Sequence, residues 1–160
     1  MSDKLEFPDT SPRDARLAAI QLLSRREHSC QELKQKLKNK GFNAPLIDKI
    51  TEDLKQEGLL SDKRFAESYT RWRINKGYGP VRISYELKQR GASEEIIAAT
   101  IIDEDPQWFE LACKVREKRF GAALPKDLKD KMKQQRFLQY RGFAQQQLKY
   151  ALSGNEELLY

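Results

Sequence analysis

Hydrophobic residues recur every three or four positions along most of the chain, with charged and amide side chains between them. In residues 15–26, Leu17, Ile20 and Leu23 follow this spacing, which places them along one side of a helix. Residues 29–32 (Ser-Cys-Gln-Glu) have the pattern of a capping box, in which serine and glutamate satisfy free backbone amides at a helix start. The pattern predicts an all-α protein.

The helical pattern returns twice, at intervals of about fifty residues. Aligning three helix-ending glycines, Gly41, Gly91 and Gly142, also aligns three leucines, Leu37, Leu87 and Leu138. The third copy departs at Gln134, which falls where Leu33 and Ile83 stand in the other two, so its packing there must differ. Neighbouring units of such arrays bury each other's apolar faces. We therefore expect three tandem three-helix repeats that form an elongated, curved molecule.

The repeat boundaries follow from this alignment. We expect repeat 1 over residues 15–60, repeat 2 over residues 61–105 and repeat 3 over residues 106–153. A flexible N-terminal segment, residues 1–14, and a C-terminal tail, residues 154–160, lie outside the repeats.

Charge is distributed unevenly along the chain. The formal net charge is +6, and 34% of residues are charged. Residues 63–91 contain eight basic and two acidic side chains, and residues 113–150 contain eleven basic and three acidic ones. Residues 92–112 between them hold six acidic side chains and no Lys or Arg. A high charge often only solvates helices, but two basic blocks around an acidic one favour a positive face that binds a polyanion.

The sequence offers no catalytic constellation. His28 is the only histidine, and no nucleophile can be paired with it, so we expect it at the surface or at a helix end. Cys30 and Cys113 are too few for a disulfide framework, which favours two reduced thiols. We expect no enzyme activity, no metal and no cofactor. The apolar runs are too short to span a membrane and no secretory signal precedes them, so we expect a cytoplasmic protein, and we expect a monomer.

Binding chemistry is better represented than catalytic chemistry. Trp72 and Tyr78 lie among cations, as in base-stacking platforms. Trp72 also continues the stripe of Phe65 and Tyr69, so we expect it in the core, whereas Tyr78 fits either an exposed contact or a lid over a repeat junction. Arginine offers bidentate geometry to phosphates and carboxylates alike. The candidate binding residues are Arg64, Arg71, Arg73, Lys76, Tyr78, Arg82, Lys88, Arg90, Arg136 and Arg141.

The central block resembles a known family. The segments DKRFA (62–66), YTRWR (69–73), KGYGPVRI (76–83) and ELKQRG (86–91) resemble the central signature of RecX, the bacterial regulators of the RecA recombinase. QRFL (135–138) with RGF (141–143) resembles the signature of the third RecX repeat, and the first repeat matches more weakly.

The resemblance implies tandem three-helix repeats, a bacterial cytoplasmic setting and a role in DNA repair, recombination and the SOS response. It further implies binding to the RecA filament on single-stranded DNA and inhibition of its ATPase, strand-exchange and co-protease activities. Double-stranded DNA is a further candidate partner. Two alternatives stay open: a general basic DNA-binding protein without a specific protein target, and an adaptor whose cations meet only acidic proteins.

Overall fold

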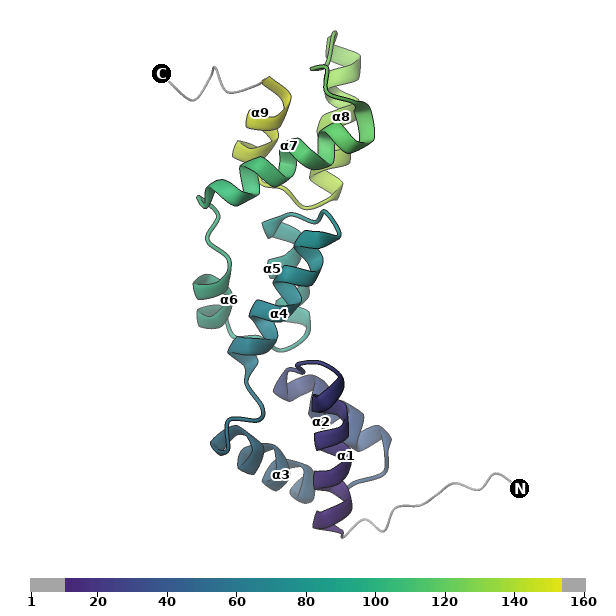
Figure 1. Cartoon of the computed structure of the whole chain (residues 1–160), viewed down its shortest axis with the longest axis vertical. Coiled ribbons are helices and arrows are strands. Elements are labelled where there is room, and N and C mark those ends of the chain that lie inside the picture. The colour runs from purple at the N-terminus through teal and green to yellow at the C-terminus, as the bar shows by residue number, and fades with distance from the viewer. Residues whose placement is uncertain (1–10, 154–160) are drawn as a thin grey trace, which may run out of the picture.

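The computed structural model describes residues 11–153, and within this range it contains nine helices and no strand. The helices form three groups of three, stacked in an elongated row (Figure 1). The expected fold class is confirmed. The helices are α1 (Pro12–Arg25), α2 (Cys30–Asn39), α3 (Ala44–Gln56), α4 (Asp62–Asn75), α5 (Pro80–Gln89), α6 (Glu94–Thr100), α7 (Pro106–Phe120), α8 (Leu128–Tyr140) and α9 (Gln145–Ser153).

Most of the expected N-terminal segment and the C-terminal tail lie outside the described residues. Residues 12–14, which the sequence assigns to the N-terminal segment, form the first turn of α1. Ser11 caps this helix by accepting a 3.3 Å hydrogen bond from the amide of Asp14. A proline at the first helical position suits such a start, because it lacks the amide that would otherwise stay unpaired.

Polar caps begin the helices where the sequence predicts them. The Ser29 hydroxyl accepts a 3.0 Å hydrogen bond from the amide of Glu32, and the Glu32 carboxylate accepts a 3.5 Å bond from the amide of Ser29. This is the predicted capping box. Asn43 and Ser93 cap α3 and α6 with one side-chain bond each, accepted from the amides of Leu46 and Ile96. These caps fix where each helix begins.

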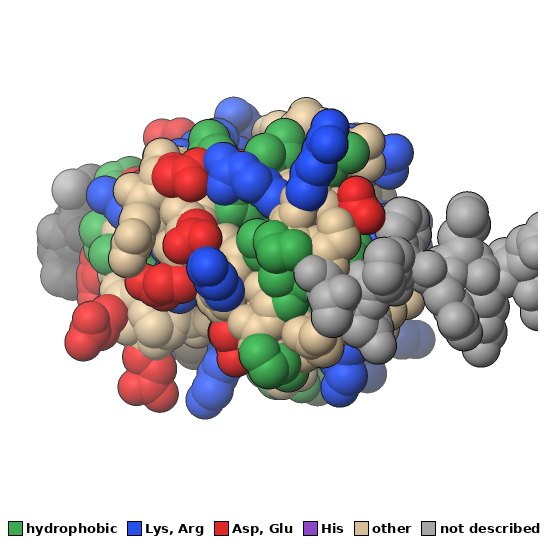
Figure 2. Space-filling view, turned by 90° about the horizontal axis from the view of Figure 1, so that it is seen from below, with side chains coloured by type: hydrophobic (Ala, Val, Ile, Leu, Met, Phe, Trp, Pro, Cys, Tyr) green, Lys and Arg blue, Asp and Glu red, His purple; other side chains and the backbone are tan. Residues whose placement is uncertain are grey.

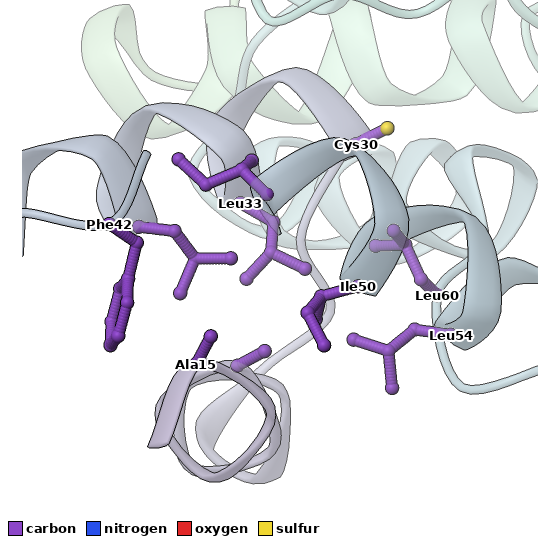
Figure 3. Close-up of a cluster of buried hydrophobic side chains, with 10 residues drawn as sticks. Ala15, Cys30, Leu33, Phe42, Ile50, Leu54 and Leu60 are labelled. Atoms are coloured by element: carbon purple, nitrogen blue, oxygen red, sulfur yellow. The ribbon is translucent and has the colours of Figure 1, made fainter. Parts of the chain in front are cut away.

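Each repeat has its own hydrophobic core. In repeat 1, Leu33 and Ile50 point toward the side of α1 that carries Ala15 (Figure 3). The equivalent leucines of the three second helices, Leu37, Leu87 and Leu138, are all fully buried. Burial of one such side chain contributes about 1.5–3 kcal/mol, so the aligned apolar positions are the residues that hold each unit together.

The second helices meet end to end. The amides of Gly79 and Val81 at the start of α5 donate hydrogen bonds of 2.8 and 2.9 Å to the carbonyls of Arg141 and Gly142, just past the end of α8. At the other junction, the Ser29 hydroxyl donates a 2.6 Å bond to the Arg90 carbonyl. Donors at a helix start, two amides at one junction and a hydroxyl at the other, therefore satisfy carbonyls at the end of another helix, groups that would otherwise lack a partner.

Two interior polar residues show where repeat 3 and repeat 1 differ from a simple apolar core. Gln134, at the position of Leu33 and Ile83, is buried, and its amide nitrogen donates a 3.3 Å bond to the Asp130 carboxylate. The packing at this position does differ, as predicted. His28 lies at a helix end, which is one of its two expected positions, because it directly precedes Ser29, the N-cap of α2. The other expectation, a surface position, is wrong, because this side chain is only 1% exposed. Its ring nitrogens lie 3.0 Å from the Arg26 carbonyl and 3.0 Å from Lys36 Nζ, and burial lowers its pKa.

Candidate nucleic-acid interface

A cationic cleft lies between repeats 2 and 3. Its volume is about 370 Å³, and its walls come from the end of α4, from α7 and from α8. Ile74, Leu111, Val115 and Phe137 form its apolar part. No Asp or Glu is among its lining residues. Five cations line it: Lys76, Lys114, Lys118, Arg119 and Arg141. We call it the cationic cleft.

Helix geometry positions these charges. Lys114 and Lys118 are exposed and lie one turn apart on the same side of α7. Lys76 and Arg141 are the C-cap residues of α4 and α8, where the negative end of the helix dipole favours a cation. Arg141 is held in place by a 3.0 Å hydrogen bond from Nη1 to the Lys76 carbonyl. The cleft therefore has a fixed cationic rim built from three helices.

Tyr78 lies beside the cleft among three arginines. The guanidinium carbons of Arg73, Arg82 and Arg141 lie 3.8, 4.4 and 5.0 Å from the centre of its ring. These distances are within the range of cation–π attraction. Arg141 belongs to repeat 3 and the other residues to repeat 2, so Tyr78 covers the repeat junction, which is the lid arrangement considered from the sequence. The ring is half-buried.

Glu86 collects hydrogen bonds from three side chains of repeat 2. Its carboxylate accepts bonds from the Tyr69 hydroxyl at 2.6 Å, from Arg73 Nη2 at 2.7 Å and from Arg82 Nε at 3.2 Å. Burial raises the pKa of Glu86, but these three hydrogen bonds outweigh it and leave the pKa below its ordinary value. Burial and the bond to Glu86 raise the pKa of Tyr69 to about 12. The positive charges of Arg73 and Arg82 are thus partly neutralised inside the protein.

Two further candidate residues join repeats 1 and 2. Arg64 donates a 3.1 Å bond to Glu27 of repeat 1 and a 2.6 Å bond to the Gly58 carbonyl. Arg90 makes its contact with repeat 1 through its backbone carbonyl, which accepts the bond from Ser29, while its guanidinium lies 4.7 Å from the ring centre of Tyr69 within repeat 2. Both residues have a structural position in the row of repeats.

The remaining candidates have exposed side chains. Arg71, Lys76, Lys88 and Arg136 are all exposed, and of these only Lys76 lines the cationic cleft. The ten candidates thus do not form a single patch. The structure brings Arg73, Tyr78, Arg82 and Arg141 together at one junction, beside Lys76. Arg64 and Arg90 lie at the junction with repeat 1, and none of Arg71, Lys88 and Arg136 lines the cationic cleft.

Three cleft residues were missed as individual candidates: Lys114, Lys118 and Arg119. They belong to the basic block of residues 113–150, so the composition contains a signal for them. Their spacing alone also shows that Lys114 and Lys118 share a helix face. The approach of α7 to the end of α4 was needed to assign them to the same site as Lys76.

Trp72 corrects a prediction. The sequence places it in the core, but its side chain is 51% exposed. It touches Tyr69 edge-on, with ring centres 5.6 Å apart, and projects beyond the stripe of Phe65 and Tyr69. The prediction failed because helical spacing shows which residues lie on the same side of α4. It does not show how far along α4 the neighbouring helices cover that side.

The predicted separation of charge is clearest at the cationic cleft and absent at the free end of repeat 1. Figure 2, a view onto that end, shows acidic, basic and hydrophobic side chains side by side.

Among the described residues, no cluster of three or more His, Cys, Asp or Glu side chains could hold a metal ion. No helix in the described part of the chain is long and apolar enough to cross a membrane.

Comparisons with known proteins match three models of one family. The first, second and third three-helix domains of RecX match residues 15–54, 61–101 and 105–152. Relatives with the name regulatory protein RecX include those of Vibrio campbellii, 43% identical over 98% of this chain and 99% of the relative, and Halorhodospira halophila, 43% identical over 88% and 87%.

Solved structures agree with the fold. A crystal structure of RecX from Lactobacillus salivarius has a TM-score of 0.76 and 23% identity, covering 93% of this chain and 97% of that one. Another, of a regulatory protein RecX, has a TM-score of 0.75 and 25% identity, covering 88% of this chain and 72% of that one. With three consecutive domain models and close relatives along nearly its whole length, the chain belongs to the RecX family of regulatory proteins.

Proposed function

We propose that the chain is a non-catalytic regulator that binds the RecA filament on single-stranded DNA and inhibits its ATPase, strand-exchange and co-protease activities. The observation that carries the proposal is the cationic cleft, with five Lys and Arg side chains and no acidic lining residue. The regulatory name shared by its relatives supports the same conclusion. In this proposal the chain acts in the cytoplasm as a monomer and needs no cofactor.

The mechanism rests on the length and stiffness of the row. The junction between repeats 2 and 3 combines two backbone hydrogen bonds with the arginines around Tyr78. A row joined in this way is suited to contact several neighbouring protomers of a helical filament at once. Its cations would meet DNA phosphates or acidic surfaces of the filament. Bridging protomers would then hinder the conformational cycle that accompanies ATP hydrolysis, or the growth of the filament.

A second candidate is a general DNA-binding protein. The same cleft favours it, because a cationic groove with an aromatic residue binds single strands without a protein partner. If about six phosphates were contacted, log affinity would fall with log salt with a slope near −4.

Co-sedimentation distinguishes these candidates. The chain is mixed with RecA filaments on single-stranded DNA, with RecA free of nucleic acid, and with the DNA alone, at the same salt concentration. Preferential binding to the filament supports the proposal. Equal affinity for bare DNA favours the general DNA-binding protein, and equal affinity for nucleic-acid-free RecA favours the adaptor that meets only protein.

A further inference from the structure

A second cleft, between repeats 1 and 2, has a different character from the cationic cleft. Its volume is about 440 Å³. One wall is an aromatic stripe of α4 formed by Phe65, Tyr69 and Trp72, and the other wall includes Arg26 and Glu32 of repeat 1. We call it the aromatic cleft. Flat apolar rings with a few polar groups around them are the usual lining of a small-ligand site.

Trp72 is the exposed ring of this cleft. Its side chain is 51% exposed, whereas Trp108, the other tryptophan, is fully buried. Tyr69 contacts the Trp72 ring edge-on at 5.6 Å, and the Arg73 guanidinium lies 5.3 Å from the Trp72 ring centre. Exposure of a large aromatic surface is unfavourable in water, and the two contacts fix the orientation of the ring. The indole is thus a preformed flat surface that a planar ligand would cover.

The charges around the cleft favour an anionic planar ligand. Its two carboxylates are already paired: Glu32 with Arg26 at 2.7 Å and Glu27 with Arg64 at 3.1 Å. Arg90 lines the same cleft, and no ion pair to a carboxylate joins it within the described part of the chain. Arg71, next to Trp72, is exposed. An aromatic ring with arginines beside it that form no ion pair among the described residues matches a nucleotide, whose base stacks and whose phosphate carries the charge.

The two clefts lie close together along α4. Trp72 lines the aromatic cleft and Lys76 lines the cationic cleft, and four residues along a helix correspond to about one turn, roughly 5.4 Å. A single strand that follows α4 would therefore reach both clefts. A duplex would not offer its bases in this way, because they are stacked within the helix, whereas a single strand can splay them onto an aromatic side chain.

From this arrangement we infer that Trp72 is a base-stacking site for single-stranded nucleic acid, next to the phosphate-binding cationic cleft. The inference rests on the proposed function, since it assigns part of the DNA contact to the aromatic cleft. It also commits to one occupant: a nucleobase rather than a side chain of a partner protein. Stacking of one base contributes about 1–3 kcal/mol, which corresponds to about a 5- to 150-fold change in affinity.

Tryptophan fluorescence tests the inference directly, because only Trp72 is exposed. An oligothymidylate is titrated into the full-length chain, and binding is followed separately by the anisotropy of a dye on the oligonucleotide. Stacking predicts that binding quenches the emission of Trp72, whereas in Trp72→Phe the remaining Trp108 emission does not change. Trp72→Ala should weaken binding of the single strand about 5- to 150-fold and leave affinity for a duplex of equal length unchanged. Trp72→Phe should retain most of the affinity. Unshifted Trp108 emission in both variants shows that the fold is kept.

The contrary outcomes separate the two proposals. Binding seen by anisotropy without quenching, or with Trp72→Ala at wild-type affinity, overturns stacking and leaves the proposed function standing. A Trp72→Ala variant that binds bare single strands normally but filaments poorly also overturns it, because Trp72 would then contact protein. If the wild-type chain binds neither the oligonucleotide nor the filament, the proposed function itself is overturned.

Discussion

The guanidinium of Arg73 lies 2.7 Å from a carboxylate oxygen of Glu86, which joins α4 to α5 within repeat 2. Both side chains are largely buried, at 13% and 15% exposure. Arg82 and Tyr69 donate to the same carboxylate. Two cations of the central signature therefore hold the fold together, while exposed residues such as Arg71 are available for binding.

Glu86→Gln should lower the free energy of unfolding by about 1.5–3 kcal/mol, because hydrogen bonds to a charged group are lost while Arg73 stays in place. Urea denaturation at pH 7 measures this change in the free energy of unfolding. Glu110→Gln on α7 is the control, since its exposed carboxylate has no such role, and it should change stability by less than about 0.5 kcal/mol. Equal effects of the two substitutions would contradict the structural assignment of Glu86.

The same carboxylate predicts a pH dependence. The pKa of Glu86 is lowered in the folded state from its ordinary value of 4.5. Its stabilising effect is therefore fully present above about pH 4.5 and is lost as the pH falls through the lowered folded value. The stability difference between wild type and Glu86→Gln should be constant from pH 7 to 5 and shrink below that range. A difference that persists unchanged at pH 2 to 3 would exclude this linkage.

Gly142→Ala should disrupt the junction between repeats 2 and 3. A Cβ at Gly142, where φ is +90°, would lie 2.2 Å from Arg82 Cβ, whereas a Cβ at Gly41, with a φ of +96°, would meet nothing within 4 Å. Gly41→Ala therefore measures the cost of the left-handed backbone alone, about 1–2 kcal/mol. Gly142→Ala should cost more and enlarge the radius of gyration in small-angle scattering. Identical stability and scattering for the two variants would refute the close packing at this junction.

Neutralising the cationic cleft should weaken binding of single strands without unfolding the protein. In Lys114→Gln/Lys118→Gln two exposed cations are lost, so the salt slope should become shallower by about 1.4 if each contacts one phosphate. Lys49→Gln/Lys55→Gln on α3 makes the same charge change away from the cleft and should leave the slope almost unchanged. Parallel losses in both double variants would indicate a nonspecific effect of net charge.

Leu87→Ala should cost about 2–5 kcal/mol, because it leaves a cavity at a fully buried position. Thermal or urea denaturation checks this value. Leu128→Ala removes the same atoms from a side chain that is 74% exposed, so it should have little effect. A melting temperature unmoved by Leu87→Ala would contradict the alignment of the repeats.

The fold was largely predictable because its signals are local and repeated. The capping box at Ser29 and the aligned pairs of leucine and glycine each depend on a few neighbouring residues, and all are found as expected. Gln134 also revealed from its position that the core of repeat 3 differs. Each of these motifs is weak by itself, but their recurrence in three aligned repeats makes the prediction strong.

The site was less predictable because it depends on how the repeats meet. Trp72 continues a hydrophobic stripe in sequence, yet its side chain is 51% exposed in the described part of the chain. Arg73 and Arg71 are chemically alike and two positions apart, but only Arg73 points toward Glu86. Lys114 approaches Lys76 only through the packing of α7 beside the end of α4. These distinctions are tertiary, so spacing along one helix does not contain them.

The single-strand-dependent ATPase activity of RecA, measured while the chain is titrated in, tests the central claim most directly. We expect inhibition that the wild-type chain and Lys49→Gln/Lys55→Gln produce equally and that Lys114→Gln/Lys118→Gln produces only at higher concentration. Unchanged ATP hydrolysis, with filaments shown to be present and the chain in excess, would contradict the proposal that this protein regulates the filament.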